Sequence, residues 1–512
     1  MRIKAFALAA LLALSTPAVA GPFAEVGNWQ LRQDVETLFA AGLIRGPIES
    51  WPLAWAQIDE GLNAAKDGRD LDPAVKAAVN RLDILSARAS ETINVELLVA
   101  ATNEPAVARD FETQARAVFD ATGSVEWNTD VISLKAAVGY RYKDLTPGQT
   151  QNYVNFDTAQ AVVRLGGWAL IGGLNEEWFG PGRDGALLWS NSARPMPKIG
   201  LKRLNPKPID FPVLRWLGPV QFEIFGGILN GDRTDYENVG IVGSRLSFVP
   251  LRGLTIGLQR SQMLCGEGRP CKIWQSFVGF GNADNSTPGD QQAFLDQPGN
   301  QIAGWDISYV QRFGQYSAKL YVEAVAEDFD NVVLEQYMRL IGLTLAGPVG
   351  TEGASFVAGV EYANTLAQAL IDGTQYPGSA YNNQLYFDGY TYLNRPIGYW
   401  TDGDSTNLAF TGSVTDTRNR RWYGSVRAVN LNMFSIGDPP LIARGPDGVP
   451  RGEISYRISK NNEKFTILTG GIELPTPYGD VRLEARYQTD SPNTPGATDP
   501  QGAIEVAFRQ YF

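Results

Sequence analysis

The chain has 512 residues, of which 19% are charged and 11% aromatic, together with 54 glycines and 30 prolines. So many turn-forming residues beside so many aromatic ones favour short strands and turns over a helical protein. It contains no histidine and only two cysteines, which removes the usual base of Ser/His/Asp catalysis, the commonest metal ligand and the thiols of a disulfide scaffold. The net charge of −11 gives no support to nucleic-acid binding, which needs a basic surface. We expect no metal, no cofactor and no nucleic-acid partner.

Residues 1–20 have the pattern of an export signal. Arg2 and Lys4 precede an apolar run, and Ala18–Ala20 forms a small-residue cleavage site. We expect cleavage after Ala20, and because the signal carries two positive charges, the net charge then changes from −11 to −13. No later stretch reaches the ~20 consecutive apolar residues of a transmembrane helix. The exported chain is therefore predicted to be either soluble outside the cytoplasm or a membrane β-barrel.

Residues 21–90 are predicted to form a small bundle of three short helices. Apolar residues recur with helical spacing in three runs, and Asp72 followed by Pro73 is typical of a helix N-cap with proline in the first turn. So short a segment has only a marginal core of its own, so we expect the bundle to pack on a larger body. The helical apolar positions are Leu31, Val35, Leu38 and Phe39, then Trp55, Ile58 and Leu62, then Val75, Val79, Leu82 and Leu85.

From about Thr92 onward the apolar period changes from 3.6 to 2, and charged residues stay on one face of each clear strand. A Lys or Arg facing lipid at the bilayer midplane costs roughly 2–4 kcal/mol, whereas one facing a wet lumen costs little. We therefore expect the charges to point inward. The apolar positions are Leu134, Ala136, Val138, Tyr140 and Tyr142 in one strand, Tyr316, Ala318, Leu320, Val322 and Ala324 in another, and Val481, Leu483, Ala485 and Tyr487 in a third.

The alternation over residues 91–512 thus predicts an all-β transmembrane barrel. About 420 residues divide into strand-and-loop units of about 23, which gives about 18 antiparallel strands. The final strand also fits, since Ile504, Val506, Phe508 and Phe512 alternate with more polar residues, although Gln510 interrupts the apolar face. A soluble β-sandwich shows the same alternation, but one of this size would split into domains with visible linkers.

Several motifs resemble the Wzi-type capsule-assembly outer-membrane proteins. The clearest are Glu176–Arg183 and Leu187–Pro197, which are similar to the family's Trp-Gly-Pro-Gly segment and its Ser/Asn-x-Ala-Arg-Pro-x-Pro segment. Phe179 stands where a second tryptophan is common, and Tyr399 stands where histidine is expected. Further matches, spread over nearly the whole mature chain, are Leu31–Asp34, Trp51–Leu53, Trp216–Pro219, Gly266–Pro270, Asp284–Asn285, Gly299–Gln301 with Asp306, and Arg395–Gly398.

The resemblance implies an eighteen-stranded outer-membrane barrel, closed toward the periplasm by the helical bundle of residues 21–90. It also implies a surface lectin, not an enzyme, that retains exported capsular or extracellular polysaccharide on the cell. The partners would be that polysaccharide and outer-membrane lipid. Two other functions stay open: a porin for small solutes, and a cell-surface glycosidase. Barrels of this width occur as monomers and as trimers, so the oligomeric state stays open too.

Residues 180–207 concentrate positive charge, with six Lys or Arg and one Asp in a chain that is otherwise acidic. Guanidinium groups could bind carboxylates of an acidic sugar polymer while indole rings stack on sugar faces. Alternatively, these cations pair with lumenal carboxylates or lipid phosphates. The prolines predict an irregular loop that could fold into the lumen. The candidate polysaccharide-binding residues are Trp178, Arg183, Trp189, Asn191, Arg194, Lys198 and Arg203.

Two smaller features have competing interpretations. Glu176 and Glu177 could be a glycosidase acid and base, but adjacent strand residues point to opposite faces, which argues against a shared bond. Cys265 and Cys271 enclose a five-residue turn, and in an oxidising compartment we expect a disulfide. Two free thiols are the alternative, and a metal site is disfavoured because the chain has no histidine.

Overall fold

The computed structural model describes residues 21–66, 70–146, 151–231, 233–269, 271, 299–330, 333–436, 441–444, 450–454, 456–494, 496 and 498–512. The predicted export signal and the family-like pair Asp284–Asn285 lie outside these residues. None of the described helices is long and apolar enough to cross a membrane.

Three helices form the first part of the described chain, as predicted: α1 (Trp29–Ala40), α2 (Trp55–Lys66) and α3 (Pro73–Ala89). The Asn28 side chain caps α1 by accepting from the Leu31 amide at 2.8 Å, and Pro73 opens α3 after Asp72. We call these helices and their connections the plug. The short strands β1 (Phe23–Ala24) and β3 (Leu53–Ala54) pair with each other within it.

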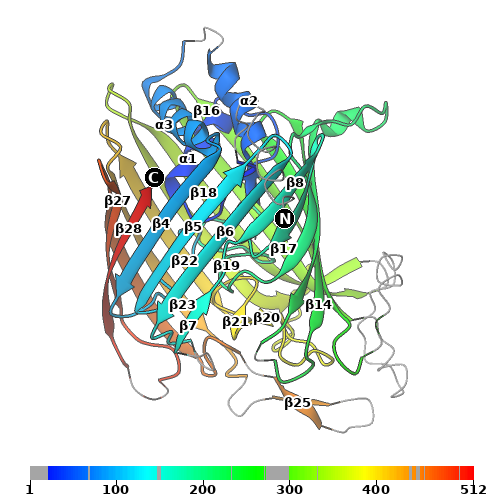
Figure 1. The fold of residues 1–512 in the computed structure, drawn as a ribbon. Coiled ribbons are helices and arrows are strands. Elements are labelled where there is room, and N and C mark those ends of the chain that lie inside the picture. Colours follow the sequence, from blue (N-terminus) through cyan, green and yellow to red (C-terminus); the bar gives the residue numbers. More distant parts are fainter. Residues whose placement is uncertain are drawn as a thin grey trace, which may run out of the picture.

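The prediction that the bundle packs on a larger body is confirmed. Val35, Leu38, Ile58 and Leu82 of the plug share one buried cluster with Phe111, Trp178 and Val249, which belong to the rest of the chain. In Figure 1 the helices lie in and over one end of a barrel.

The body is a closed barrel of antiparallel strands, in which β28 pairs with β4 to complete the ring. Its segments correspond to eighteen strands, because β7 and β8 both pair with β6, and β11 and β12 both pair with β13. The predicted barrel of about 18 strands is therefore confirmed. The barrel segments are β4 (Ile93–Thr102), β5 (Phe119–Asn128), β6 (Ile132–Tyr142), β7 (Asn152–Asn155), β8 (Gln160–Leu165), β9 (Trp168–Gly173), β11 (Lys198–Arg203), β12 (Lys207–Pro208), β13 (Pro219–Leu229), β14 (Val239–Leu251), β15 (Leu254–Leu264), β16 (Asn300–Phe313), β17 (Tyr316–Asp330), β18 (Val333–Val349), β19 (Ala354–Gln368), β22 (Thr406–Thr415), β23 (Arg421–Leu431), β26 (Glu463–Thr476), β27 (Gly479–Gln488) and β28 (Gln501–Tyr511).

The strand faces have the predicted phase. In β27, Leu483 is exposed on the outer wall, whereas Arg482 and Glu484 are buried in the lumen. Arg482 pairs there with Glu505 of β28 at 2.5 Å. Leu134, Leu320 and Ile504 are likewise exposed on their strands. The outer wall is therefore apolar and the lumen is charged, as a membrane barrel requires.

The two ends of the barrel differ (Figure 1). The helix end, which holds the plug and the chain's carboxyl terminus, has mostly short turns, among them residues 166–167, 252–253, 314–315 and 477–478. The loop end has long connections, among them residues 103–118, 369–405, 432–462 and 489–500. Two small hairpins belong to these connections: β20 (Thr391–Tyr392) with β21 (Arg395–Pro396), and β24 (Leu441–Arg444) with β25 (Pro450–Ile454).

Candidate functional site

Residues 174–197, which we call the lumen loop, fold into the barrel between β9 and β11. Their backbone amides find acceptors on the barrel wall, as a buried loop requires. Glu361 of β19 accepts from the amides of Arg183 at 2.7 Å and Asp184 at 3.1 Å. Glu323 of β17 accepts from the amide of Leu187 at 3.1 Å. Carboxylates on distant strands therefore hold the irregular segment that the prolines predicted.

The plug and the lumen loop are joined by charge and by backbone pairing. Arg32 of α1 donates to the carbonyl oxygens of Pro181 at 3.0 Å and Gly182 at 2.8 Å. The strand β10 (Trp178–Phe179) of the lumen loop pairs with β2 (Ser50–Trp51) of the plug. The two segments thus form one interior body.

Glu36 of α1 is the centre of this junction. Its carboxylate lies 2.5 Å from Arg183 Nη1, 3.3 Å from Lys319 Nζ and 3.4 Å from Arg32 Nε. Burial alone would raise the pKa of Glu36, but Lys319, Arg183 and Arg32 together outweigh it and lower the pKa to about 2. One carboxylate therefore neutralises cations from the plug, the lumen loop and the barrel wall.

Four of the predicted site residues lie deep inside. Trp178 packs edge-on against Phe111 at 5.3 Å, and Trp189 packs edge-on against Phe225 at 4.8 Å. Arg183 is buried on Glu36, and Asn191 is buried with its carbonyl oxygen 2.7 Å from Arg116 Nη2. Phe179, where the family resemblance suggested tryptophan, is also fully buried, beside Trp189.

The predicted cations are mostly paired within the lumen. Lys198 lies 3.2 Å from Glu177, and Arg203 donates to the carbonyl oxygen of Val220 at 3.0 Å. Arg194 pairs with Asp157 at 3.0 Å and lies over the Tyr153 ring, with 18% of its side chain exposed. The interpretation that these cations pair with lumenal groups therefore describes Arg183, Arg194 and Lys198.

Three further arginines near the loop end were not among the binding residues proposed from the sequence. Arg116 pairs with Glu176 at 3.2 Å and contacts lumen-loop carbonyls. Arg109 donates to the carbonyl oxygens of Gln114 and Ala115, and Arg395 donates to that of Val107. Neither Arg109 nor Arg395 forms an ion pair with a carboxylate of the described residues. Arg109 and Arg116 stand among unlike neighbours in the sequence, where no local pattern marks them, whereas Arg395 begins the family-like segment Arg395–Gly398.

Burial and the neighbouring Arg116 lower the pKa of Arg395 to about 10. Burial, Arg116 and Arg395 likewise lower the pKa of Arg109. The Nε atom of Arg109 is buried without a hydrogen-bond partner. This part of the loop end therefore holds positive charge that the surrounding residues do not fully compensate.

The adjacent carboxylates Glu176 and Glu177 have different partners, although neither lies in a strand as the sequence argument assumed: both belong to the irregular start of the lumen loop. Glu176 contacts Arg116 at 3.2 Å, whereas Glu177 contacts Lys198 at 3.2 Å and accepts from Asn175 at 2.6 Å. Across the described part of the chain, no group of three or more carboxylates and thiols is arranged to hold a metal ion.

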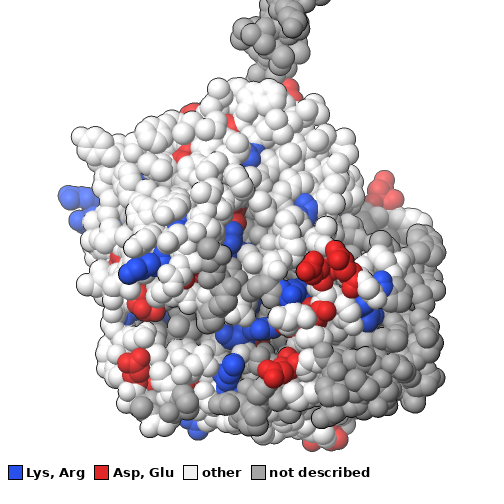
Figure 2. Space-filling view, turned by 60° about the horizontal axis from the view of Figure 1, so that its bottom comes forward, with Lys and Arg blue, Asp and Glu red and all other residues white. Residues whose placement is uncertain are grey.

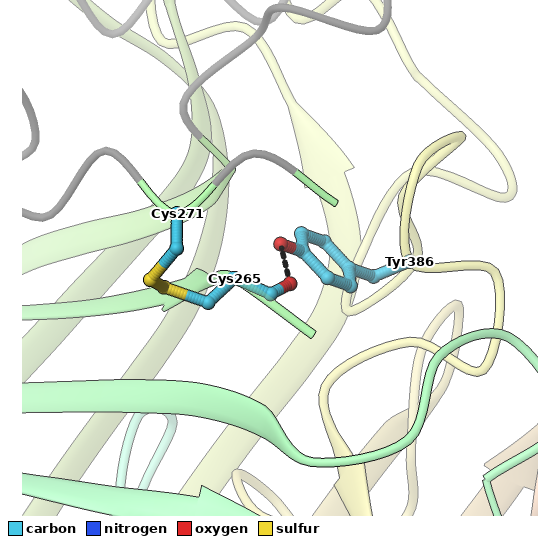
Figure 3. Close-up of a disulfide and its surroundings, with 3 residues drawn as sticks. All are labelled: Cys265, Cys271 and Tyr386. Carbon is cyan, nitrogen blue, oxygen red and sulfur yellow. Dashed lines mark hydrogen bonds between the residues drawn. A yellow bond between two sulfur atoms is a disulfide. The ribbon is translucent and has the colours of Figure 1, made fainter. Parts of the chain in front are cut away.

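Cys265 and Cys271 form a disulfide with an S–S distance of 1.98 Å (Figure 3). The Tyr386 hydroxyl donates to the carbonyl oxygen of Cys265 at 2.8 Å, so residues 369–405 contact this turn. The guanidinium of Arg269, within the turn, lies over the Tyr386 ring at 5.1 Å. The disulfide thus belongs to the packed loop end.

These features define a membrane β-barrel whose lumen is occupied by a helical plug and an inward-folded loop. The model of the family "Capsule assembly protein Wzi" matches residues 88–415. The chain belongs to this family, and it is an outer-membrane protein, which confirms the resemblance found in the sequence.

Two known proteins illustrate the relationship. An uncharacterized 55.8 kDa protein in the cps region of Klebsiella pneumoniae is 28% identical over 326 residues, which are 62% of this chain and 61% of that relative. The solved structure of Escherichia coli Wzi is 19% identical and has a TM-score of 0.76 over 96% of this chain and 99% of its own. That protein is described as an outer-membrane, carbohydrate-binding β-barrel involved in group 1 capsule assembly.

Proposed function

We propose that this protein binds exported capsular or extracellular polysaccharide at the cell surface and retains it there. The observation that carries this proposal is the filled lumen, in which plug and loop are tied to the wall through Glu36, Glu323 and Glu361. A barrel filled in this way presents its loop end, and not a pore, as the working surface. Family membership and the carbohydrate-binding description of the Escherichia coli relative support the same function.

We place the helix end in the periplasm and the loop end outside the cell. Outer-membrane barrels have short periplasmic turns and longer extracellular loops, and this barrel has the same asymmetry. The proposed domain division follows: a signal removed after Ala20, a periplasmic plug over residues 21–90, and an outer-membrane barrel over residues 91–512. The apolar outer wall would contact outer-membrane lipid.

We propose Arg194 and Arg395 as contacts for acidic groups of the polymer. Arg194 is partly exposed, and Arg395 has no carboxylate partner among the residues described. Figure 2 shows lysine and arginine side chains interspersed with acidic ones over the loop end. Trp178, Arg183, Trp189, Asn191 and Lys198 would act indirectly, by fixing the lumen loop, whereas Arg203 donates to the carbonyl oxygen of Val220 within the barrel wall.

The test is binding of the purified protein, in detergent, to polysaccharide isolated from its own host, with neutral dextran as the comparison polymer. Arg194→Ala and Arg395→Gln should weaken binding, and the variants should keep the heat-dependent gel mobility of an assembled barrel. Arg418→Gln, an exposed change in the turn at the helix end, is the matched control and should bind normally. Unchanged binding by both loop-end variants would remove this site.

We propose no catalytic role for Glu176 or Glu177, because each carboxylate is held by a different cation. Glu177→Gln should therefore leave both polymer retention and polymer length unchanged. Shortening of the polymer by the wild type, abolished in this variant, would instead establish a glycosidase.

A further inference from the structure

Residues 209–218, which we call the rim segment, join β12 to β13 at the helix end and project sideways from the barrel (Figure 1). The neighbouring turns 166–167, 252–253 and 314–315 are much shorter. The rim segment includes a single 3-10 turn, η1 (Arg215–Leu217). Its exposed apolar side chains are those of Phe211, Val213, Leu214 and Trp216.

The rim segment contacts the outer wall near its end, at Trp216. Trp216 packs edge-on against Phe248 of β14, with ring centroids 6.2 Å apart. Phe248 follows the inward-facing Arg245 and Ser247 in the alternation of β14, so it faces outward, yet it is buried. Gly218 fixes the return to β13: its φ is +67°, and a Cβ there would lie 2.0 Å from the Val249 carbonyl oxygen. Trp216 therefore lies at the outer surface of the barrel.

Beside the rim segment, a groove of about 490 Å³ separates the end of α1 from the turn between β14 and β15. A groove of this volume is large enough for part of a small amphiphile. Its lining is mainly apolar, and Arg45 and Arg252 are its cations. The apolar lining residues are Phe39, Ile44, Pro219, Val249, Pro250 and Leu251.

The two guanidiniums are exposed and carry uncompensated charge. Arg252 lies across Gly42 and donates to the Ala41 carbonyl oxygen at 3.2 Å. Neither Arg45 nor Arg252 forms an ion pair with a described carboxylate. Guanidinium groups bind phosphate oxygens through paired hydrogen bonds. An apolar groove with cations at its rim, beside the exposed Leu251, matches an acyl chain joined to a phosphate.

We propose that this groove binds an anionic phospholipid of the periplasmic leaflet, with acyl carbons along Leu251 and the phosphate between Arg45 and Arg252. The rim segment would extend the same contact into the leaflet through Trp216. This inference rests on the proposed orientation of the barrel but not on polysaccharide binding. A failure of either idea therefore leaves the other testable.

The experiment is native mass spectrometry of the full-length mature protein in detergent, titrated with dioleoylphosphatidylglycerol. We expect a bound lipid in the wild type and about tenfold weaker binding in the Arg45→Gln/Arg252→Gln double variant, because charge-assisted hydrogen bonds to phosphate are lost. Arg418→Gln, an exposed change at the same end of the barrel, should bind like the wild type. Because both substituted arginines are exposed, the double variant should still fold. Heat-dependent gel mobility verifies that its barrel is assembled.

Three comparisons decide the result. Equal lipid binding by the double variant would overturn the proposal. Displacement of the lipid by millimolar inorganic phosphate would also overturn it, because the groove would then be a phosphate site without a lipid role. Stronger binding of lipid A than of phosphatidylglycerol would contradict the periplasmic orientation, and with it the proposal, while leaving the polysaccharide assay unaffected.

Discussion

The same four-residue pattern, Trp-x-Gly-Pro, occurs in the lumen loop at residues 178–181 and in the rim segment at residues 216–219, with opposite outcomes. Trp178 is 0% exposed, whereas Trp216 is 63% exposed. Both glycines have positive φ, +106° at Gly180 and +67° at Gly218, so the local chain bends in a conformation that favours glycine in both places.

The difference shows that the motif determines the bend but not the burial. Around residue 178, Trp51 of the plug and Phe111 of another loop enclose the indole. Around residue 216, the indole contacts the Phe248 ring on the outer wall. Tertiary surroundings therefore decide whether the segment becomes part of the protein interior or part of its outer surface.

The largest expected effect comes from truncating the two indoles. Trp178→Ala should lower the free energy of unfolding by about 3–5 kcal/mol, because it leaves a cavity in a closely packed interior. Trp216→Ala should change it by no more than about 0.5 kcal/mol, as exposed substitutions usually do. Equilibrium unfolding in detergent, followed by circular dichroism, measures both. Equal losses would mean that the two surroundings do not differ as described.

Removing the central carboxylate should have the next largest effect. Glu36→Gln should destabilise the protein by about 3 kcal/mol, since it leaves buried cations without their partner. The control is Asp83→Asn, which removes the exposed ion pair with Lys66 and should cost about 0–1 kcal/mol. The same unfolding measurement applies. If Glu36→Gln is as stable as Asp83→Asn, Glu36 does not hold the plug, the lumen loop and the barrel wall together.

The pH dependence sharpens that test. The pKa of Glu36 in the folded protein is about 2, below its ordinary value of 4.5, so its carboxylate stabilises the fold fully above pH 4.5. That contribution should be lost as the pH falls from 4.5 toward 2. The difference in unfolding free energy between wild type and Glu36→Gln should therefore shrink over this interval. If the difference in unfolding free energy stays constant over this interval, the Glu36 carboxylate does not stabilise the fold through its charge.

The smallest effect concerns the two glycines. A Cβ at residue 180 would approach the Glu323 carboxylate, and one at residue 218 would approach the Val249 carbonyl. Gly180→Ala should lower global stability by about 1–2 kcal/mol through backbone strain. Gly218→Ala should instead loosen only the rim segment, which trypsin would then cleave faster at Arg215. Unchanged cleavage would contradict the close packing at Gly218.

The sequence predicted the features that depend on local period or on a long motif. The three helices, the inward charges of strands such as 479–488, and the membrane barrel follow from period, and the family follows from segments 176–183 and 187–197. The barrel phase is predictable because a misplaced charge facing lipid is costly.

The contacts of the lumen loop were not predictable in the same way. Glu36, Glu323 and Glu361 come from a helix and two strands that are far from Arg183 in sequence. Some lumenal carboxylates accept hydrogen bonds from lumen-loop amides, and others face a neighbouring strand. The residues next to them in the sequence do not distinguish the two kinds. The sequence also did not predict that the rim segment projects outward, because its Trp-x-Gly-Pro motif also occurs in the lumen loop, which folds inward.

Deletion of the gene in the native host, with complementation by the wild-type gene, tests whether this protein retains polysaccharide at the cell surface. Cell-associated and released polysaccharide are measured in each strain. We expect the deletion strain still to make polymer but to shed it into the medium, and complementation to restore retention. Unchanged retention with reduced uptake of small solutes would overturn the proposed function and establish a porin.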